Sequence, residues 1–456
     1  MAPDESPEKN LKDAILGGEV PRMIESMMKL SLERGASDIH IEPHKHFVQV
    51  RLRVDGILQI LVEYPLNLHP GVISRVKIMS NLKIDESRLP QDGRITTYIG
   101  ETEVDMRTST LPTVNGEKVV MRVVDKSKKI PQLEELGIVG RNHARFMKAF
   151  ADPNGIILTS GPTGSGKTTT LYSALNFLNS TEKNIMTFED PIENQMEGLN
   201  QSQMRTDIGY TFANGLRTAL RQDPDIIMVG EIRDRETIDI AIEASLTGHL
   251  VLSTIHTNSA VETITRILNM KIPDFLLTAS VNLIIAQRLA RKLCPKCKVP
   301  LAPSTDARKK IQGAFSVFSP YEGFDESMLN DPIFYSPNKD GCETCGGQGY
   351  KGRVGIYEVL YMSENIKKSI LANSPSFEIQ KLAQKEGMVT LEQDGLVKAI
   401  KGETSLEEVY KLVKNNEVGG TTNIHQTIPS RQRRHKKLKI ISMRLFWILK
   451  AKTRQP

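Results

Sequence analysis

A run of glycines, hydroxyls and one lysine carries the clearest chemical signal in this 456-residue chain. Its members are Gly161, Pro162, Thr163, Gly164, Ser165, Gly166, Lys167, Thr168 and Thr169. Glycines at this spacing let backbone N–H groups converge on a phosphate, while Lys167 supplies a point charge and Thr168 a hydroxyl ligand for Mg²⁺. The run follows the strand-like Ile156–Ser160 and precedes a helical segment. It therefore predicts a nucleotide phosphate site at a helix N-terminus, the alternative being a glycine-rich turn that meets the pattern by chance.

Two other apolar stretches end in carboxylates. Ile226–Val229 is followed by Gly230 and Glu231, and an acid there suits a Mg²⁺-bound water beside the nucleotide. Ile185–Phe188 delivers the acidic run from Glu189 to Glu193. Because ligands of open α/β sheets bind at the carboxyl ends of the strands, these carboxylates are expected near the glycine-rich run, where they can polarise an attacking water. The alternative for the second run is a solvated acidic loop.

The four cysteines form two pairs of the Cys-x₂-Cys type. They are Cys294, Cys297, Cys342 and Cys345. No thiol is left over, and in a reducing compartment such pairs favour a metal over disulfides. Four thiolates can enclose Zn²⁺ with no open position, which marks a structural site. The 44 residues between the pairs exceed the spacing of a compact zinc finger, so the spacing alone leaves zinc favoured but not fixed.

Hydrophobic periodicity predicts two kinds of fold along the chain. Pro21–Glu33 has the pattern of an amphipathic helix. After it come mostly alternating, strand-like segments and one helix, typical of an α+β domain: Ile39–Ile41, Val48–Val54, Ile57–Val62, Gly71–Asn81, Glu103–Thr108 and Lys118–Val124. From about Ile138, apolar runs alternate with helical segments, which indicates a mostly parallel sheet with helices on its faces. The strand candidates there are Ile156–Ser160, Ile185–Phe188, Ile226–Val229 and Leu250–Thr254.

The basic excess of the chain is confined to its last 38 residues. Residues 419–456 hold ten Lys or Arg and no Asp or Glu, so subtracting ten from the net charge of +6 leaves −4 on residues 1–418. Three interpretations of this tail are open: contact of its polybasic cluster and neighbouring apolar stretch with an anionic membrane surface, a disordered tail, or a terminus created by an error in the source sequence. No apolar stretch is long enough to span a bilayer, and the acidic N-terminus lacks a signal sequence, so a cytoplasmic location is expected.

Three long strings resemble the secretion ATPases of type II secretion and type IV pilus assembly. They are TFEDPIE at 187–193, RTALRQDPDIIMVGEIRD at 217–234 and LTGHLVLSTIHTN at 246–258. GASDIHIEP at 35–43 and RLPQDGR at 88–94 resemble the N-terminal domain of the same family. The resemblance covers about residues 21–415. It implies a RecA-like P-loop core, preceded by a PAS-like α+β domain and followed by a four-cysteine zinc insertion and C-terminal helices.

The resemblance also implies roles for individual residues. Glu193 is expected to activate the attacking water with Glu189 as its assistant, and Glu231 is the expected Walker B acid and partner of Mg²⁺. His249 and His256, at the ends of the histidine box, are expected to sense the γ-phosphate, although isolated histidines are more often ordinary core or surface residues.

Two arginines of the N-terminal domain match positions from which the family reaches the nucleotide phosphates. They are Arg107 and Arg122. A guanidinium supplied in this way stabilises charge that develops on the transferred phosphoryl group. Without the resemblance, an ordinary solvated strand face explains both arginines equally well.

The resulting domain plan has seven parts. It comprises a flexible leader over 1–20, the N-terminal domain over 21–124, a linker over 125–137, the ATPase domain over 138–290, a four-cysteine subdomain over 291–360, C-terminal helices over 361–418 and the basic tail over 419–456. Assembly ATPases of the family commonly carry a further N-terminal domain, whereas about 20 residues precede Pro21 here, which departs from the usual mode of docking on the membrane platform.

The function implied by the resemblance is a hexameric, Mg²⁺-dependent ATPase that powers assembly of pilin or pseudopilin subunits. Its expected partner is an inner-membrane platform protein, and its expected location is the cytoplasm at the periphery of that membrane. The zinc insertion favours the assembly direction, because retraction motors generally lack it. The alternative is a nucleic-acid or conjugation-type motor, against which the acidic body and an aromatic content of 5% both count. A nucleotide-binding scaffold without turnover is a third, less favoured class. The strings do not distinguish pilus assembly from type II secretion.

Overall fold

The computed structural model describes residues 7–125, 129–317, 326–329 and 332–414. The predicted basic tail at 419–456 lies outside these residues. Within them, no helix combines the length and the apolar character that crossing a bilayer requires.

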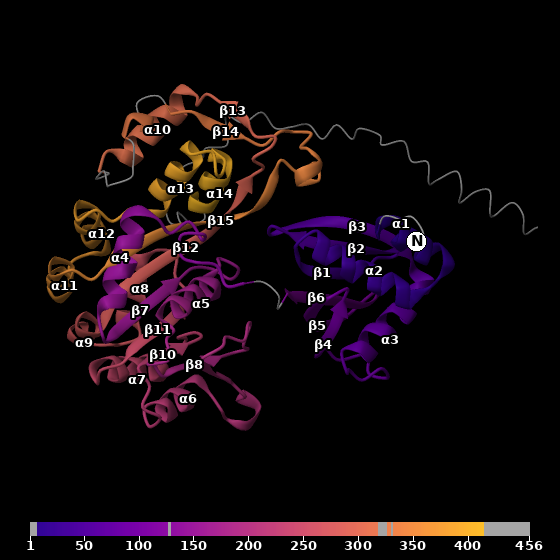
Figure 1. The fold of residues 1–456 in the computed structure, drawn as a ribbon, viewed down its shortest axis with the longest axis horizontal. Helices are drawn as coiled ribbons and strands as arrows, with labels where there is room; N and C mark the ends of the chain where they lie inside the picture. The colour runs from indigo at the N-terminus through magenta and orange to yellow at the C-terminus, as the bar shows by residue number, and fades with distance from the viewer. Residues whose placement is uncertain (1–6, 126–128, 318–325, 330–331, 415–456) are drawn as a thin grey trace, which may run out of the picture. The chain divides into compact units, whose positions relative to one another are not determined.

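The N-terminal region is built on a six-stranded antiparallel sheet with the strand order β3-β2-β1-β6-β5-β4 (Figure 1). The strands are β1 Ala36–Pro43, β2 Phe47–Val54, β3 Ile57–Pro65, β4 Gln91–Ile99, β5 Thr102–Thr113 and β6 Gly116–Asp125. Alternation along β1 sets its two faces, since Ile39 and Ile41 are buried in the core under the helices while Asp38, His40 and Glu42 point the other way. The polar face of this sheet therefore carries a row of charged side chains.

Helices cover the apolar face of this sheet. They are α1 Pro7–Gly17, α2 Val20–Glu33, the 3₁₀ turn η1 Leu66–Leu68 and α3 His69–Met79. The prediction of a flexible leader over 1–20 is wrong for α1, because Leu11 and Ala14, three residues apart on one helical face, are buried against α2. Strand β4 was not predicted. Its sequence, QDGRITTYI, contains a glycine and several polar residues, and the strand is half-exposed at the edge of the sheet.

The second region is a seven-stranded mixed sheet with the order β15-β12-β7-β11-β10-β8-β9. Its strands are β7 Gly155–Ser160, β8 Ile185–Glu189, β9 Leu199–Gln203, β10 Ile226–Val229, β11 Leu250–Ile255, β12 Val281–Leu293 and β15 Tyr350–Tyr361. All neighbouring pairs are parallel except β12 with β15. The predicted α/β class and its four strand candidates are confirmed, whereas the polar β9 and the long β12 were not predicted.

Helices cover both faces of this sheet, so its strands are apolar on both sides. Ile157 and Met228 belong to the core under α4 and α5, whereas Leu158 and Ile227, one residue along, belong to the opposite core. The helices of the first face are α4 Gly140–Ala151 and α5 Lys167–Leu178. Those of the second core include α6 Phe212–Ala219, α7 Arg235–Leu246, α8 Ala260–Asn269 and α9 Asp274–Ser280 (Figure 1).

The cysteine-containing segment is an excursion between β12 and β15. It includes β13 Val299–Leu301, α10 Thr305–Phe315, η3 Glu326–Leu329, β14 Phe334–Ser336 and η4 Glu343–Cys345. The predicted boundary at 290/291 falls inside β12, because the apolar run of that strand continues to Leu293 before the first cysteine. The chain then forms the predicted C-terminal helices, α11 Glu364–Leu371, α12 Ser376–Lys385, α13 Leu391–Ile400 and α14 Leu406–Lys414.

Candidate active site and metal centre

The glycine-rich run connects the carboxyl end of β7 to α5, as the sequence predicts. Gly164 and Gly166 have φ values of 79° and 89°, which other residues adopt only with strain. A Cβ on Gly161 would lie 2.6 Å from the carbonyl oxygen of Gln287. The loop thus requires glycine at these positions for its backbone path. Helix α5 begins at Lys167 without a side-chain cap, and the N–H groups at a helix start point toward the preceding loop.

Lys167 lies folded over this loop. Its Nζ donates to the carbonyl oxygens of Gly161 at 2.9 Å and Pro162 at 3.2 Å. Burial lowers the pKa of the Lys167 ammonium below its usual value; Arg288 acts in the same direction and Glu231 opposes it. Glu231, which opposes the effect of burial, follows a different strand from the one that leads into the phosphate loop.

Glu231 follows β10, which is parallel to β8 and β11 in the sheet, so it lies at the same edge as the phosphate loop. Its carboxylate contacts Arg233 at 2.7 Å and His256 Nε2 at 2.7 Å. His256 follows β11 and joins this group. His249 instead precedes β11 at the opposite edge, where its Nδ1 lies 2.8 Å from the carbonyl oxygen of Ala244. The structure therefore brings one of the two predicted histidines to the site.

The two predicted catalytic carboxylates, one at the end of β8 and one in the loop after it, have different surroundings. Glu189 is buried, and its side chain accepts hydrogen bonds from Thr187 Oγ1 at 2.6 Å and Gln201 Nε2 at 3.0 Å, with a further one from the Tyr172 hydroxyl. Glu193 is about one-third exposed on the loop that follows. Water can therefore reach Glu193, while Glu189 is occupied by protein donors.

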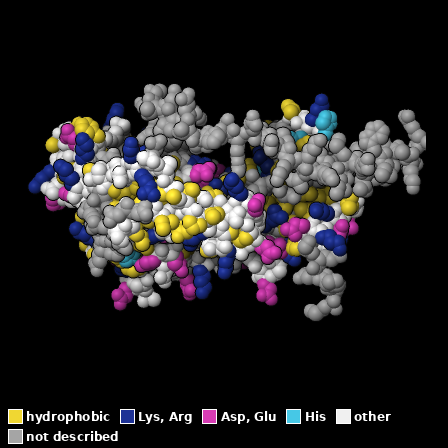
Figure 2. Space-filling model, turned by 90° about the horizontal axis from the view of Figure 1, so that it is seen from above, with side chains coloured by type: hydrophobic (Ala, Val, Ile, Leu, Met, Phe, Trp, Pro, Cys, Tyr) yellow, Lys and Arg dark blue, Asp and Glu magenta, His cyan; other side chains and the backbone are white. Residues whose placement is uncertain are grey.

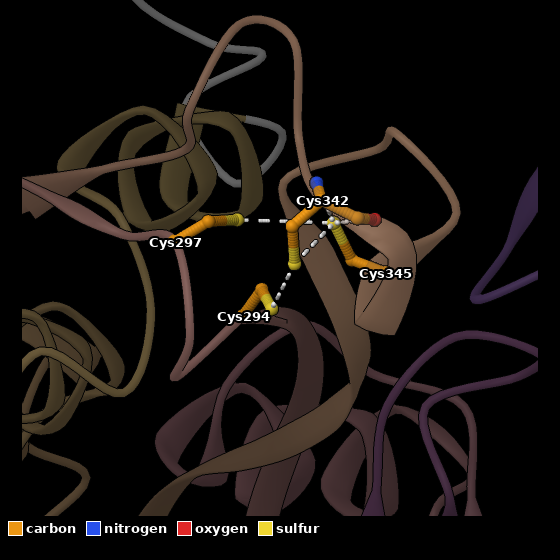
Figure 3. A group of neighbouring side chains, drawn as sticks. All are labelled: Cys294, Cys297, Cys342 and Cys345. Carbon is orange, nitrogen blue, oxygen red and sulfur yellow. Dashed lines mark hydrogen bonds between the residues drawn. The ribbon is translucent and has the colours of Figure 1, made fainter.

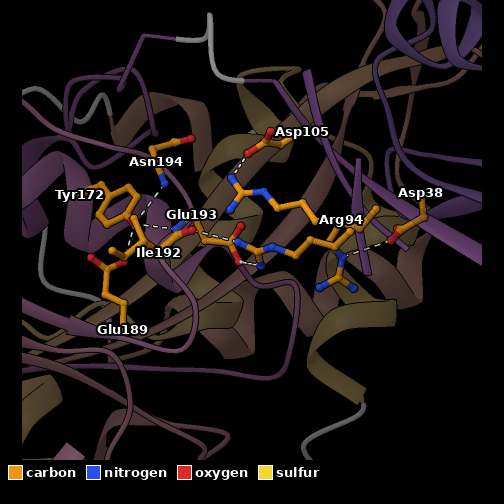
Figure 4. A network of polar contacts seen from close by, with 10 residues as sticks. Asp38, Arg94, Asp105, Tyr172, Glu189, Ile192, Glu193 and Asn194 are labelled. Atoms are coloured by element: carbon orange, nitrogen blue, oxygen red, sulfur yellow. Dashed lines mark hydrogen bonds and ion pairs between the residues drawn. The ribbon is translucent and has the colours of Figure 1, made fainter. Parts of the chain in front are cut away.

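Arg107 of the N-terminal sheet contacts the Glu193 loop. Its guanidinium donates to Glu193 Oε1 and to the carbonyl oxygen of Ile192, both at 2.9 Å. Figure 4 labels these two acceptor residues. Arg122 is paired with Arg107 in register on the same face, but its Nε donates to Asp38 Oδ1 at 3.2 Å. Arg94 is the next residue along this row and pairs with Asp105. Of the two predicted arginines, Arg107 thus reaches the acidic loop in this structure.

Several residues that support the site were not predicted. Gln287 Nε2 donates to the carbonyl oxygen of Ser165 at 2.8 Å, and Arg288 donates to the carbonyl oxygen of Asn258 at 2.9 Å. These neighbours in β12 thus connect the phosphate loop and the segment after β11. The available signal was a Gln-Arg pair that interrupts the apolar run of β12. Tyr172, in contrast, has the pattern of an ordinary core residue.

The four predicted cysteines come together in one cluster (Figure 3). All four sulfur atoms lie within 4.8 Å of one another. Cys294 and Cys342 are 3.7 Å apart at sulfur, and both Cys297 and Cys342 lie 3.8 Å from Cys345. A tetrahedron with Zn–S bonds of about 2.3 Å has S···S edges of about 3.8 Å, so these donors fit zinc closely.

Backbone donors complete the surroundings of one sulfur. The N–H groups of Cys342 and Gly349 each donate to the sulfur of Cys345 at 3.2 Å. Burial raises the pKa of this thiol, but hydrogen bonds from the two N–H groups, together with those from the Cys297 and Cys342 side chains, lower the pKa to about 6. Thiolates bind metals and thiols do not, so the peptide groups prepare Cys345 as a ligand. Across the described ranges, no second group of metal-binding side chains was found.

Charged side chains do not form a basic groove on the face of the molecule drawn in Figure 2. Lys and Arg are interspersed there with Asp and Glu wherever the side chains are coloured. Nucleic-acid binding normally requires a stripe or patch of one sign, so this face offers no footprint for it.

A family model described as "Type II/IV secretion system protein" matches residues 16–411. The chain is 45% identical over 417 residues to the type IV pilus assembly ATPase PilB of Pseudomonas aeruginosa, a match that spans 90% of this chain and 70% of the relative. It is 44% identical over 395 residues to the type II secretion system ATPase E of Vibrio cholerae, spanning 87% of this chain and 75% of that one.

Solved structures share the fold. A crystal structure of the pilus retraction motor PilT with bound ADP superposes with a TM-score of 0.55 at 26% identity, covering 85% of this chain and 96% of that chain. The ATPase DotB of Legionella pneumophila superposes with a TM-score of 0.61 at 21% identity, covering 87% of this chain and 96% of the other.

Proposed function

The chain belongs to the type II/IV secretion system protein family and is an ATP hydrolase of its pilus-assembly and type II secretion class, and we propose that it works as a hexameric motor. In this proposal, Mg²⁺-dependent hydrolysis of ATP drives the incorporation of pilin or pseudopilin subunits into a filament. The family membership confirms the resemblance seen in the sequence. The oligomer, the cargo and the partner go beyond it and are part of the proposal.

One observation carries the assignment of the active site. The phosphate loop, Glu231 and the Glu193 loop follow β7, β10 and β8, three strands that run parallel in one sheet, so they lie at the same edge. Because nucleotides bind at the carboxyl ends of such strands, this edge is where a bound triphosphate would contact all three. A protein with a purely structural role would have no need to bring two carboxylates and a lysine that folds over the loop together at this edge.

The residues of this edge divide the reaction between them. The loop N–H groups and the start of α5 would hold the phosphates, with Lys167 neutralising the charge that moves toward the leaving phosphate. Thr168 and Glu231 would hold Mg²⁺, which would withdraw charge from the phosphates. Glu193 would accept the proton of the attacking water, since it is the water-accessible carboxylate. Glu189 keeps a supporting role in this scheme, because protein donors already occupy its oxygens.

Arg107 is proposed to close the site. In this structure its guanidinium holds Glu193 and the carbonyl oxygen of Ile192. A shift of this side chain from the carboxylate to a phosphate would release Glu193 for water and bring positive charge to the reaction. Arg122 is proposed as the second such group, and its release from Asp38 would be required first.

Zinc is proposed as a structural ion of the four-cysteine cluster. Three of the S···S distances match a tetrahedral site and all four sulfurs lie within 4.8 Å of one another, so four protein ligands would leave no position for a substrate. The cluster joins the end of β12 to the start of β15. It would therefore fix the excursion between two strands of the ATPase sheet.

The proposed partner is a platform protein of the inner membrane, with the motor on the cytoplasmic side of that membrane. This part rests on the relatives, which are named for pilus assembly and type II secretion. The absence of a membrane-crossing helix from the described residues is compatible with a motor that docks on a membrane protein.

The motor proposal is tested by light scattering during size-exclusion chromatography, with and without a non-hydrolysable ATP analogue. A mass near six chains with the analogue supports the proposal, and a monomer at micromolar concentration under every nucleotide condition overturns the hexamer. ATPase activity is measured in the same samples with and without single-stranded DNA. A chain that ends at Val418, and so lacks the basic tail, is assayed in the same way. Strong stimulation of its ATPase activity by DNA would favour a nucleic-acid motor instead.

A further inference from the structure

The water-activating carboxylate proposed above sits on a loop that has no regular structure of its own. Residues 190–198 lie between β8 and β9 and contain neither helix nor strand. A catalytic carboxylate must be held within a fraction of an ångström of its working position, so something else has to fix this backbone.

Tyr172 of α5 supplies that fixed point (Figure 4). Its phenolic oxygen accepts hydrogen bonds from the backbone N–H of Glu193 at 3.1 Å and of Asn194 at 3.3 Å. Its O–H donates to the carboxylate of Glu189. One hydroxyl thus serves the two peptide groups that carry Glu193 and is oriented by the buried acid at the end of β8.

The tyrosine is itself immobile. Tyr172 is 2% exposed and belongs to the apolar core that also contains Leu175, Ile185 and Met196. Burial, with the neighbouring Glu189 carboxylate, raises the pKa of Tyr172 far above its usual value, so the hydroxyl keeps its proton and remains a donor to that acid. The same helix begins at Lys167, five positions earlier, and follows the phosphate loop directly.

Gln201 of β9 holds the loop from the other side. Its Nε2 donates to the carbonyl oxygen of Asn194 at 2.9 Å as well as to Glu189, and its Oε1 accepts from the N–H of Met196 at 2.7 Å. Glu189 is therefore the common acceptor of the two side chains that clamp the loop. This accounts for a buried carboxylate that water does not reach.

We propose that Tyr172 is a positioning residue of the ATPase reaction, which fixes the Glu193 loop to the phosphate-binding helix with Glu189 as its acceptor. The inference rests on the proposed role of Glu193 as the water activator. Tyr172 contacts no phosphate and takes no proton in this scheme. Removing its hydroxyl should therefore lower kcat and leave nucleotide binding intact.

The test compares Tyr172→Phe with Tyr357→Phe in the full chain. Tyr357 is equally buried in the same core, and its hydroxyl donates to the carbonyl oxygen of Leu136 at 3.2 Å, away from the Glu193 loop. We expect Tyr172→Phe to lose at least about tenfold in kcat, with KM and the affinity for a fluorescent ATP analogue within about twofold. Tyr357→Phe should keep kcat within about twofold. Equal kcat in the wild type and in Tyr172→Phe, or equal losses in the two Phe variants, overturns the proposal.

A double-mutant cycle separates positioning from a general structural effect. If Tyr172 acts through Glu193, then Tyr172→Phe should change the residual rate of Glu193→Gln by less than about twofold, because the group being positioned is already gone. The same loss in both backgrounds would show that Tyr172 acts independently of Glu193 and would overturn the inference.

Gln201→Met is a second variant, which tests the proposal even if Tyr172→Phe does not fold. It removes the hydrogen bonds to Asn194 and Met196 and should also lower kcat with KM kept. If both Tyr172→Phe and Gln201→Met retain the wild-type kcat, the loop needs no clamp. If the wild type itself hydrolyses no ATP, the proposed function fails. This result is distinct from the failure of the present inference, in which the wild type and Tyr172→Phe hydrolyse ATP equally well.

Discussion

The nucleotide edge of the large sheet and the four-cysteine cluster both gather reactive side chains, but they are built in opposite ways. At the edge, the groups arrive from the ends of separate strands, and Glu193 is open to solvent while Glu189 is buried. At the cluster, two short turns bring four sulfurs within 4.8 Å, and Cys294 and Cys345 are buried. The first arrangement suits a ligand that enters and leaves, and the second suits an enclosed ion. Substitutions should therefore separate turnover from stability.

The largest expected effect is that of Lys167→Ala on turnover. Loss of the ammonium removes the point charge that faces the phosphates, and hydrolysis should fall by about 10³-fold or more. Phosphate release measures the rate, while zinc content and melting temperature should match the wild type. A variant that hydrolyses ATP normally would refute the assignment of the phosphate loop.

Arg107→Ala should be the next most severe change. A guanidinium that stabilises a transferring phosphoryl group is worth about 10³-fold or more when fully engaged, so a loss of at least about 10²-fold is expected in the assembled protein. Arg107→Lys should recover little, because an ammonium lacks the planar fork. Full activity of Arg107→Ala would show that its contact with Glu193 has no part in the reaction.

Cys342→Ser should lower stability while leaving turnover nearly unchanged. With one thiolate missing, the cluster should lose its zinc and the melting temperature should drop by several degrees, as for loss of a few kcal/mol. At 20 °C the ATPase rate should stay within about threefold of the wild type, because the phosphate loop is formed by other strands. A stable variant that keeps one zinc per chain would contradict the four-thiolate site.

The histidines give the smallest expected difference. His256→Ala removes a 2.7 Å contact with Glu231 and should lower kcat several-fold. His249 lies at the opposite edge, so His249→Ala should lower kcat less. It should instead lower the melting temperature, because it removes the contact with the carbonyl oxygen of Ala244. The opposite order of effects would mean that the first histidine reaches the nucleotide in a way this structure does not show.

The sequence predicted best what depends on backbone geometry and on repeated residue types. The phosphate loop could be predicted because left-handed backbone angles require glycines, and these stand out in the sequence. The metal site could be predicted because four cysteines in two close pairs have few other uses. The apolar β7, β8, β10 and β11 were equally clear, since strands buried on both faces are continuous runs of apolar residues.

The supporting side chains could not be predicted in the same way. Tyr172 lies in an apolar helix face, and only the fold shows that its hydroxyl meets the loop after β8. Gln287 and Arg288 act through backbone carbonyls of distant segments, which no spacing in the sequence encodes. Likewise α1 was expected to be loose because its composition is polar, although Leu11 and Ala14 are buried on one face of the helix.

The most direct test of the account measures ATP binding and ATP hydrolysis in parallel on the wild type and on Glu193→Gln. The exchange keeps the size of the side chain and removes the group that accepts the proton of water. We predict an ATP affinity within about twofold of the wild type and a hydrolysis rate at least about 10²-fold lower. Hydrolysis by Glu193→Gln at the wild-type rate would contradict the assignment of this edge as the catalytic site.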